Sequence, residues 1–331
     1  MRTANYRFVI AAAMGLVLTG FSLNAETTDP VGAMVITAKS GSDTGLSVPF
    51  HRSPLFTGSI KDISGSVVTV HGSPGWTTDT YISAGHFALL ASGSKEGAYF
   101  TILSNGSDTL TLEIVDTDLS GVASNASDPA LGDAIDIYPY WTPATLLPAT
   151  LPAGSSILLF DKSTTINKSA AVLLNYNGTN WLRGFSVAND ELLHPYESFV
   201  LRLPDSADVD LVFHGKVPMS KHRLVINNDG GSGTSVQTDF RISYMSPVST
   251  TVSEMGLGFE AGDSLLFFDN TASGINKSAA IILNFNGTDW LQGFSVANDF
   301  VIEPGQSMVF RKIGGTTQPE VVWASLQNYL Q

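Results

Sequence analysis

Asp43, Thr44 and Gly45 match the loop of an aspartic protease, in which two carboxylates share a proton. No second Asp-Thr-Gly or Asp-Ser-Gly follows, and the preceding residues 38–42 are not the apolar strand that such a loop needs. The motif is therefore interpreted as an ordinary turn. The sequence assigns no catalytic residue, which favours a non-enzymatic protein without deciding the question.

Metal-ligating patterns are sparse. The six histidines form neither a His-x-His pair nor a His-Glu-x-x-His helix, so no zinc site is predicted. Polar loops beginning at Asp161 and Asp269 offer the oxygen ligands that calcium prefers, but Lys162 stands in the first loop where the second has Asn270. Ca²⁺ is thus a weak candidate, with a solvated turn as the alternative, and no cofactor is predicted.

Three aromatic residues could stack on sugar rings, and they form a candidate sugar platform: Trp76, Tyr140 and Trp141. A glycosidase would also need two carboxylates facing a cleft, and their separation cannot be read from a sequence. Aromatic residues of β-rich chains more often belong to the core, and this alternative stays open.

Most of the polar candidates belong to a stretch that the chain contains twice, residues 166–190 and 275–299. Only five of these 25 paired positions differ. A packed core would explain the shared apolar residues but gives no reason for the shared polar ones. These polar residues are predicted to form interaction loops: Asn167, Lys168, Asn189, Asp190, Asn276, Lys277, Asn298 and Asp299. Recent duplication and simple Asx turns are the alternatives.

Each copy is predicted to be a β-hairpin. Asn177-Gly178, like Asn286-Gly287 in the second copy, suits a two-residue type I′ turn between β-forming runs. That turn pairs Leu174 with Trp181 and places both on one face with Tyr176, because side chains alternate along a strand. This face is predicted to be the core side.

The N-terminal stretch indicates an exported protein, and the charge of the chain bears on its partners. Residues 1–25 have the layout of a secretory signal peptide, so the mature chain is expected to begin at Glu26 and to lie in the periplasm, on the cell surface or outside the cell. No later stretch is apolar enough to span a membrane. There is no cysteine, and the formal net charge of −13 disfavours nucleic acid as a partner.

Short β-forming runs and turn residues predict an all-β fold. Residues 26–142 are predicted to form a small β-barrel or sandwich, and the proline-rich residues 143–153 a linker. Two homologous hairpin-rich modules follow, residues 154–244 and 245–331.

Three stretches support a family resemblance: residues 48–54, residues 137–142 and the Asn-Gly-x-x-Trp repeats. Together they resemble a family of exported β-rich repeat proteins of verrucomicrobial-type bacteria. The resemblance covers nearly the whole mature chain and implies export and a β architecture. It transfers no activity and no catalytic residue.

Two classes of function follow. The first is an exported structural or interaction protein that assembles with itself or adheres at the cell surface, since exposed strand edges can pair with another chain. The second is a carbohydrate-binding protein or glycan hydrolase whose partner is a surface glycan.

Overall fold

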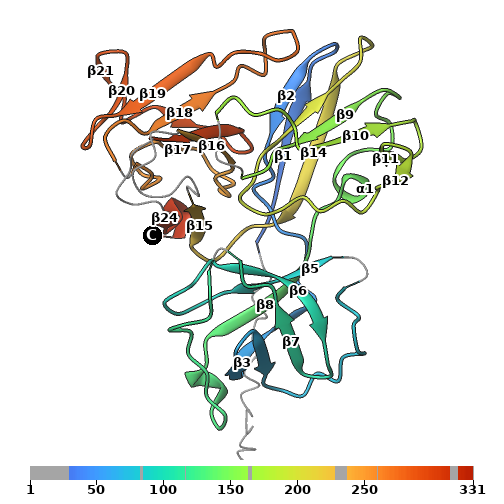
Figure 1. Ribbon diagram of the computed structural model, residues 1–331, viewed down its shortest axis with the longest axis vertical. Coiled ribbons are helices and arrows are strands. Elements are labelled where there is room, and N and C mark those ends of the chain that lie inside the picture. The colour runs from blue at the N-terminus through green and yellow to red at the C-terminus, as the bar shows by residue number, and fades with distance from the viewer. Residues whose placement is uncertain are drawn as a thin grey trace, which may run out of the picture.

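The computed structural model describes residues 30–82, 85–115, 117–162, 166–227, 237–258, 260–313 and 320–330. Across them the chain is almost entirely β, as predicted. Two strand-rich repeats lie side by side, and a closed barrel lies at one end of this pair (Figure 1). The predicted signal peptide, residues 1–25, lies outside the described residues.

The first repeat contains a six-stranded antiparallel sheet in the order β12-β11-β10-β9-β13-β2. Its strands are β2 (Asp43–Leu46), β9 (Ser156–Leu159), β10 (Val172–Tyr176), β11 (Trp181–Arg183), β12 (Ser186–Val187) and β13 (Phe199–Arg202). A two-stranded ribbon pairs β1 (Val31–Ala38) with β14 (Val209–Lys216). The first repeat is therefore built from two strands that come before residue 47 and from others that come after residue 155.

The second repeat has the same plan. Its sheet has the order β21-β20-β19-β18-β23-β16, which corresponds strand for strand to the order given for the first repeat. Its strands are β16 (Thr238–Ile242), β18 (Ser264–Phe267), β19 (Ile281–Phe285), β20 (Trp290–Gln292), β21 (Ser295–Val296) and β23 (Met308–Lys312). Its ribbon pairs β15 (His222–Asn227) with β24 (Glu320–Ser325), and β17 (Thr250–Thr251) pairs with β22 (Val301–Ile302). A short 3₁₀ helix, Asn328–Leu330, follows.

The barrel closes in the order β3-β4-β7-β6-β5-β8. Its strands are β3 (Phe56–Ser64), β4 (Val67–Val70), β5 (His86–Leu90), β6 (Tyr99–Asn105), β7 (Thr109–Leu112) and β8 (Ala134–Pro139), with a 3₁₀ turn at Pro129–Leu131. Ile60, Leu90, Leu110 and Ile135 fill its interior, where alternate side chains point inward. Of the two predicted alternatives, a small barrel or a sandwich, the structure shows the barrel.

The predicted domain boundaries are wrong, because the barrel is inserted into the first repeat. Strands β1 and β2, predicted to belong to the N-terminal domain at 26–142, pair instead with β14 and β13 of the first repeat. The chain leaves and rejoins the repeat at neighbouring points, where the Trp141 Nε1 donates to the Phe50 carbonyl at 2.9 Å. In Figure 1 the blue strands β1 and β2 accordingly lie among the yellow and yellow-green strands of the first repeat.

The predicted linker, residues 143–153, is structured. It begins with α1 (Pro143–Leu146), whose N-terminus is capped by Thr142 with proline in the first turn. Leu147 and Leu151 are then buried in the core of the first repeat. The predicted border between residues 244 and 245 is also wrong, because β15 and β16 precede it and belong to the second repeat.

The hairpin turns are longer than predicted. Tyr176 pairs with Trp181, so residues 177–180 form a four-residue loop rather than a two-residue turn. The Asn177 Oδ1 accepts from the N–H groups of Thr179 and Asn180 at 2.9 and 2.8 Å, an Asx turn that stabilises this loop. The register differs from the prediction by two residues, which preserves the side-chain face. Leu174, Tyr176 and Trp181 are therefore buried together as predicted.

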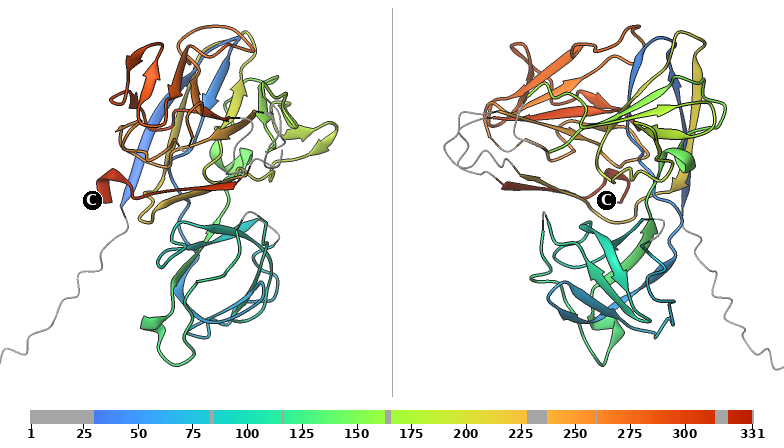
Figure 2. Two further views of the ribbon diagram at one scale, coloured as in Figure 1. Left: turned by 60° about the vertical axis from the view of Figure 1, so that its left-hand side comes forward. Right: turned by 45° about the vertical axis from the view of Figure 1, so that its right-hand side comes forward.

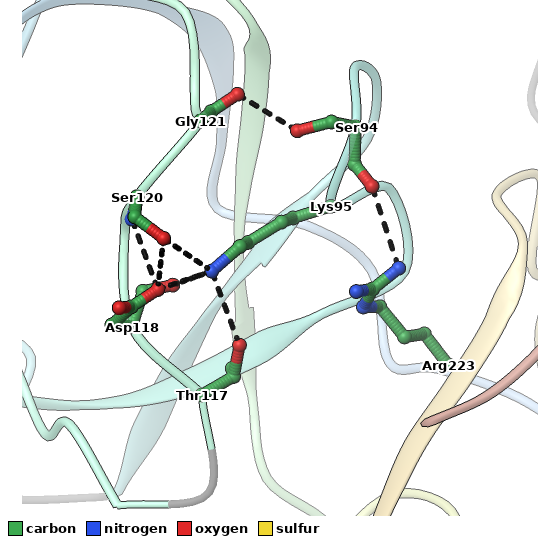
Figure 3. Close-up of polar contacts among 7 residues, drawn as sticks. All are labelled: Ser94, Lys95, Thr117, Asp118, Ser120, Gly121 and Arg223. Carbon is green, nitrogen blue, oxygen red and sulfur yellow. Dashed lines mark hydrogen bonds and ion pairs between the residues drawn. The ribbon is translucent and has the colours of Figure 1, made fainter. Parts of the chain in front are cut away.

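Hydrogen bonds attach the barrel to the first repeat and to the ribbon of the second repeat. The Tyr196 Oη donates to the Gly97 carbonyl at 2.9 Å, and Arg223 on β15 donates to the Ser94 carbonyl (Figure 3). Lys95, in the same turn of the barrel, forms an ion pair with Asp118 in the adjacent loop. Two further views show the barrel below the repeats from other directions (Figure 2).

Candidate functional site

Each repeat contains an aspartate–arginine ion pair that forms hydrogen bonds to the other repeat. In the first repeat the Asp43 carboxylate on β2 accepts two hydrogen bonds from Arg202 on β13, at 2.6 and 3.0 Å. The second repeat's Asn276 completes this contact: its backbone N–H donates to Asp43 at 2.7 Å, and its side-chain oxygen accepts from Arg202 at 2.9 Å. Charge-assisted bidentate bonds of this kind fix geometry as well as adding energy.

The reciprocal contact uses the equivalent residues. Arg311 holds Asp239 at 2.7 and 2.9 Å and donates to the Asn167 side chain at 3.0 Å, and the Asn167 N–H donates to Asp239 at 2.8 Å. Asn167 and Asn276 both have positive φ, 51° and 52°, a conformation that asparagine tolerates better than most residues. The shared Asn-Lys-Ser sequences therefore connect one repeat to the other.

A pseudo-two-fold axis runs between the repeats. Ser198 and Ser307 are equivalent residues, and their hydroxyls hydrogen-bond to each other at 3.0 Å. Isolated bridges join Leu46 to Gln306 and Glu197 to Ile242, again as equivalent pairs. Such reciprocal contacts are those of a two-fold interface, here formed within one chain.

A cleft of about 760 Å³ lies between the two sheets around this axis. Leu158 and Val200 of the first repeat and Leu266 and Val309 of the second form apolar parts of its lining. Five cationic side chains and two carboxylates also line it: Lys168, Arg202, Arg241, Lys277 and Arg311, with Asp43 and Asp239. The cleft is therefore cationic in a protein that is acidic as a whole.

Arg241 on β16 breaks the symmetry of the cleft. Its guanidinium carbon lies 4.0 Å from the centre of the Phe160 ring and 5.3 Å from that of Phe268, equivalent residues of the two repeats. Burial lowers the pKa of Arg241 to about 10, and the nearby carboxylates of Asp239 and Asp43 oppose that shift. Its side chain makes no hydrogen bond or ion pair with any described residue. Gly45 occupies the matching position in the first repeat.

The two predicted interaction lysines fold back onto their own loops. Lys168 Nζ donates to the Asp161 carbonyl at 3.0 Å, and Lys277 Nζ donates to the carbonyls of Asp269 and Ala272 at 2.7 and 3.0 Å. Desolvation lowers the pKa of both lysines. The geometry favours a role in shaping these loops, which then dock onto the other repeat.

In the second predicted interaction loop of each repeat, the asparagine has a structural role and the aspartate is exposed. The Asn189 Oδ1 accepts from the Trp181 N–H at 2.8 Å, and Asn298 binds Trp290 in the same way. Asp190, like Asp299 in the second repeat, is exposed. Asn189 and Asn298 thus stabilise the start of β11 and β20.

Each repeat carries an apolar tip. Phe185 follows β11 and is 104% exposed, and Phe294 follows β20 and is 105% exposed. Val187 and Val296, one on each edge strand, are 63% and 62% exposed. We call these two places the Phe tips, with residues 184–187 in the first repeat and 293–296 in the second. They lie on opposite sides of the two-repeat body, at β12 and β21 (Figure 1).

The predicted sugar platform is not assembled. Tyr140 is 0% exposed and packs against Phe87, so its ring cannot take a ligand, and its assignment is corrected. Trp76 packs edge-on against Phe56 and Tyr81 of the barrel. The three rings form no common surface, because Trp76 packs against the barrel core and Tyr140 is fully buried.

Trp141 lines a separate pocket of about 220 Å³ where the barrel meets the first repeat. Arg52 lies 5.7 Å from the centre of its ring. The pocket also contains the carboxylates of Glu191 and Glu197, which form ion pairs with Arg183 and Lys162. If the protein binds sugar, this pocket offers an aromatic ring and carboxylates together.

The candidate calcium loops have internal partners for several of their oxygens. In the second loop the Asp269 Oδ1 accepts from the N–H and hydroxyl of Thr271, and its carbonyl accepts from Lys277. Among the described residues, no cluster of three or more histidine, aspartate or glutamate side chains could hold a metal ion. Within the same ranges, no helix has the length and apolar character needed to cross a membrane.

Comparisons with protein families, curated proteins and solved structures find no match. The fold defines the class of protein: two pseudo-symmetric β repeats with a closed barrel inserted into the first.

Sequence reasoning missed Arg202, Arg311 and Arg241. One signal was present, since Arg202 and Arg311 end the matched strands 198–202 and 307–311. Their partners Asp43 and Asp239 gave no such signal, because the short stretches around them share little sequence.

Proposed function

We propose that this is an exported, non-enzymatic interaction protein that assembles with further copies of itself through its two Phe tips. The observation that supports this most directly is the complete exposure of a phenylalanine at the same position of both repeats. A single exposed apolar residue is unremarkable on a protein surface, but the same fully exposed aromatic side chain at two matched sites suggests a common contact. Export is the expectation from residues 1–25.

A second copy of this chain is the occupant that best fits the tips. Both tips adjoin an edge strand, β12 or β21, whose outer side is unpaired in the described sheets. Because the tips lie on opposite sides, one molecule can contact two neighbours, and the result is a ring or a filament. The tips also differ in charge, since Arg183 beside the first is Gln292 beside the second.

The size of the tips predicts weak contacts. A phenylalanine buries on the order of 200 Å², so two tips and their valines bury less than the roughly 800 Å² per partner of a stable interface. Assembly should therefore depend strongly on protein concentration and be favoured where copies are crowded, as on a cell surface.

The test measures the mass of residues 26–331 by light scattering over a range of concentrations, with negative-stain images. Wild type should form oligomers as concentration rises, and Phe185→Ala with Phe294→Ala should stay monomeric. Each single variant then distinguishes the pairing: dimers indicate contact between like tips, and monomers indicate contact between unlike tips. Val35→Ala, which trims an exposed valine on β1, is the control and should assemble like wild type.

A wild-type protein that is monomeric at every concentration would contradict self-assembly. Equal assembly of wild type and the double variant would show that the tips are not the contact. In either case a glycan array would be the next experiment, directed at the pocket around Trp141.

A further inference from the structure

We infer that the cleft between the repeats is a binding site for a monoanionic carboxylate on an apolar body, with Arg241 as the residue that binds the carboxylate. This site is separate from the Phe tips and does not depend on self-assembly. Three features support it: the volume of the cleft, the surroundings of Arg241 and the pairing of the other charges.

The volume and lining suit a small ligand. About 760 Å³ is within the range of 300–1,000 Å³ that is typical of ligand pockets. Leu158, Leu266, Val200 and Val309 present apolar surface on both sides. A few polar groups within an apolar lining are what such pockets use to orient a ligand.

Arg241 is the cation in the cleft whose hydrogen bonds are unused among the described residues. Arg202 and Arg311 are each committed to an aspartate and an asparagine, and Lys168 and Lys277 to carbonyls of their own loops. The flanking Phe160 and Phe268 rings hold the guanidinium by cation–π contact and leave its N–H groups for a ligand. A guanidinium binds a carboxylate through two parallel hydrogen bonds.

The nearby charges favour a monoanion over a dianion. Asp43 and Asp239 are close enough to Arg241 to act on it electrostatically. Each of these carboxylates is paired with Arg202 or Arg311, and Lys168 and Lys277 lie near the carboxylates of Asp161 and Asp269. The one charge of Arg241 that is left without a close partner is therefore matched by a single negative charge. The apolar lining then stabilises the body of the ligand but gives little to a small inorganic ion.

Calorimetric titration of residues 26–331 tests the site with three carboxylates: hexanoate, glucuronate and an N-acetylated Leu-Leu peptide. They represent a fatty acid, an acidic sugar and a peptide C-terminus. We expect hexanoate or the peptide to bind one per chain, and hexanol, the amidated peptide and inorganic phosphate to bind at least about tenfold more weakly. Tighter binding of glucuronate than of hexanoate would overturn the apolar part of the inference.

Arg241→Gln should weaken carboxylate binding about tenfold to a hundredfold, which is the effect of losing a charge-assisted pair of hydrogen bonds. Arg241→Lys keeps the charge without the two parallel bonds and should give an intermediate loss; it also serves if the glutamine variant does not fold. Arg183→Gln is the matched control, because the second repeat has Gln292 at that position, and it should bind like wild type.

Three results would overturn the site. The first is that no carboxylate binds wild type at up to about 10 mM. The second is equal binding by wild type and a folded Arg241→Gln variant. The third is that Arg183→Gln weakens binding as much as Arg241→Gln, which would indicate general charge attraction. Phosphate binding tighter than all three carboxylates would overturn the preference for a monoanion.

Discussion

At the scale of single residues, this protein buries polar side chains without always pairing them. Neither ring nitrogen of His222 has a hydrogen-bond partner among the described residues, and the ring lies among Tyr196, Tyr244 and Trp323. Burial without a partner disfavours the charged imidazolium and lowers the pKa of His222 to about 3. His51 is buried in the same way at the junction with the barrel, and its pKa is also about 3.

His222 makes the folded state sensitive to acid. Unfolding exposes the ring, whose pKa returns to about 6.5, so between pH 6.5 and 3 the unfolded chain binds more protons. Stability is therefore constant above pH 6.5 with respect to this group and falls as the pH decreases below it. Replacing His222 with phenylalanine should reduce the slope of unfolding free energy against pH by about 1.4 kcal/mol per unit between pH 6 and 4.

Urea denaturation at several pH values measures this slope. His214→Phe on β14 is the control, because it makes the same substitution at an exposed position. Parallel curves for wild type and His222→Phe would show that His222 is protonated, or is reached by water, in the folded protein.

At the scale of elements, the hairpins depend on asparagine side chains as much as on strand pairing. Asn189 accepts from the Trp181 N–H and donates to the Asn180 side chain at 2.8 Å each. The second repeat makes the same bonds with Asn298 and Asp289. Because Trp181 is buried, its N–H needs this partner in the fold.

Asn189 and Asp190 are neighbours, and both are identical in the two repeats. They allow a direct comparison between a structural residue and an exposed one. Asn189→Ala should lower the free energy of unfolding by about 1–3 kcal/mol, because it leaves a backbone N–H beside a buried side chain without a partner. Asp190→Ala should change it little, since the side chain is exposed. Chemical denaturation measures both. Equal losses in the two variants would contradict this assignment of roles.

At the scale of the whole molecule, the barrel is an insertion whose two connections lie together. Arg52 donates to the Tyr140 carbonyl at 3.2 Å, so a short link can replace what lies between them. We expect a chain in which a Gly/Ser linker replaces residues 53–139 to keep a cooperative unfolding transition. Residues 53–140 alone should also fold, because the barrel closes on itself around its own core.

Truncation at the border predicted from the sequence should have the opposite result. A chain of residues 143–331 lacks β1 and β2, so it loses eight paired residues of the ribbon and the Asp43 that holds Arg202 and Asn276. We expect it to aggregate or to unfold without a cooperative transition. Circular dichroism and size-exclusion chromatography of the three chains test both predictions. A folded 143–331 chain beside an unfolded barrel-less one would contradict the insertion.

Sequence alone determined the local features of this protein. Alternation and turn residues predicted the all-β class and an N-terminal barrel or sandwich. The face shared by Leu174, Tyr176 and Trp181 was also predicted correctly, because an error of two residues in register keeps each side chain on the same face. Local patterns suffice for such features because strand propensity, turn chemistry and side-chain alternation are properties of neighbouring residues.

Only the tertiary structure decided three features: the insertion of the barrel, the reciprocal hydrogen bonds between the repeats, and the cleft. Asp43 meets Arg202 across 159 residues, and Arg311 meets Asn167 across 144. A single sequence does not show which distant residues form such pairs, because each pair depends on how whole sheets pack against one another. Arg241 illustrates the limit: its type is visible in the sequence, but its position between Phe160 and Phe268 exists only once the two repeats have come together.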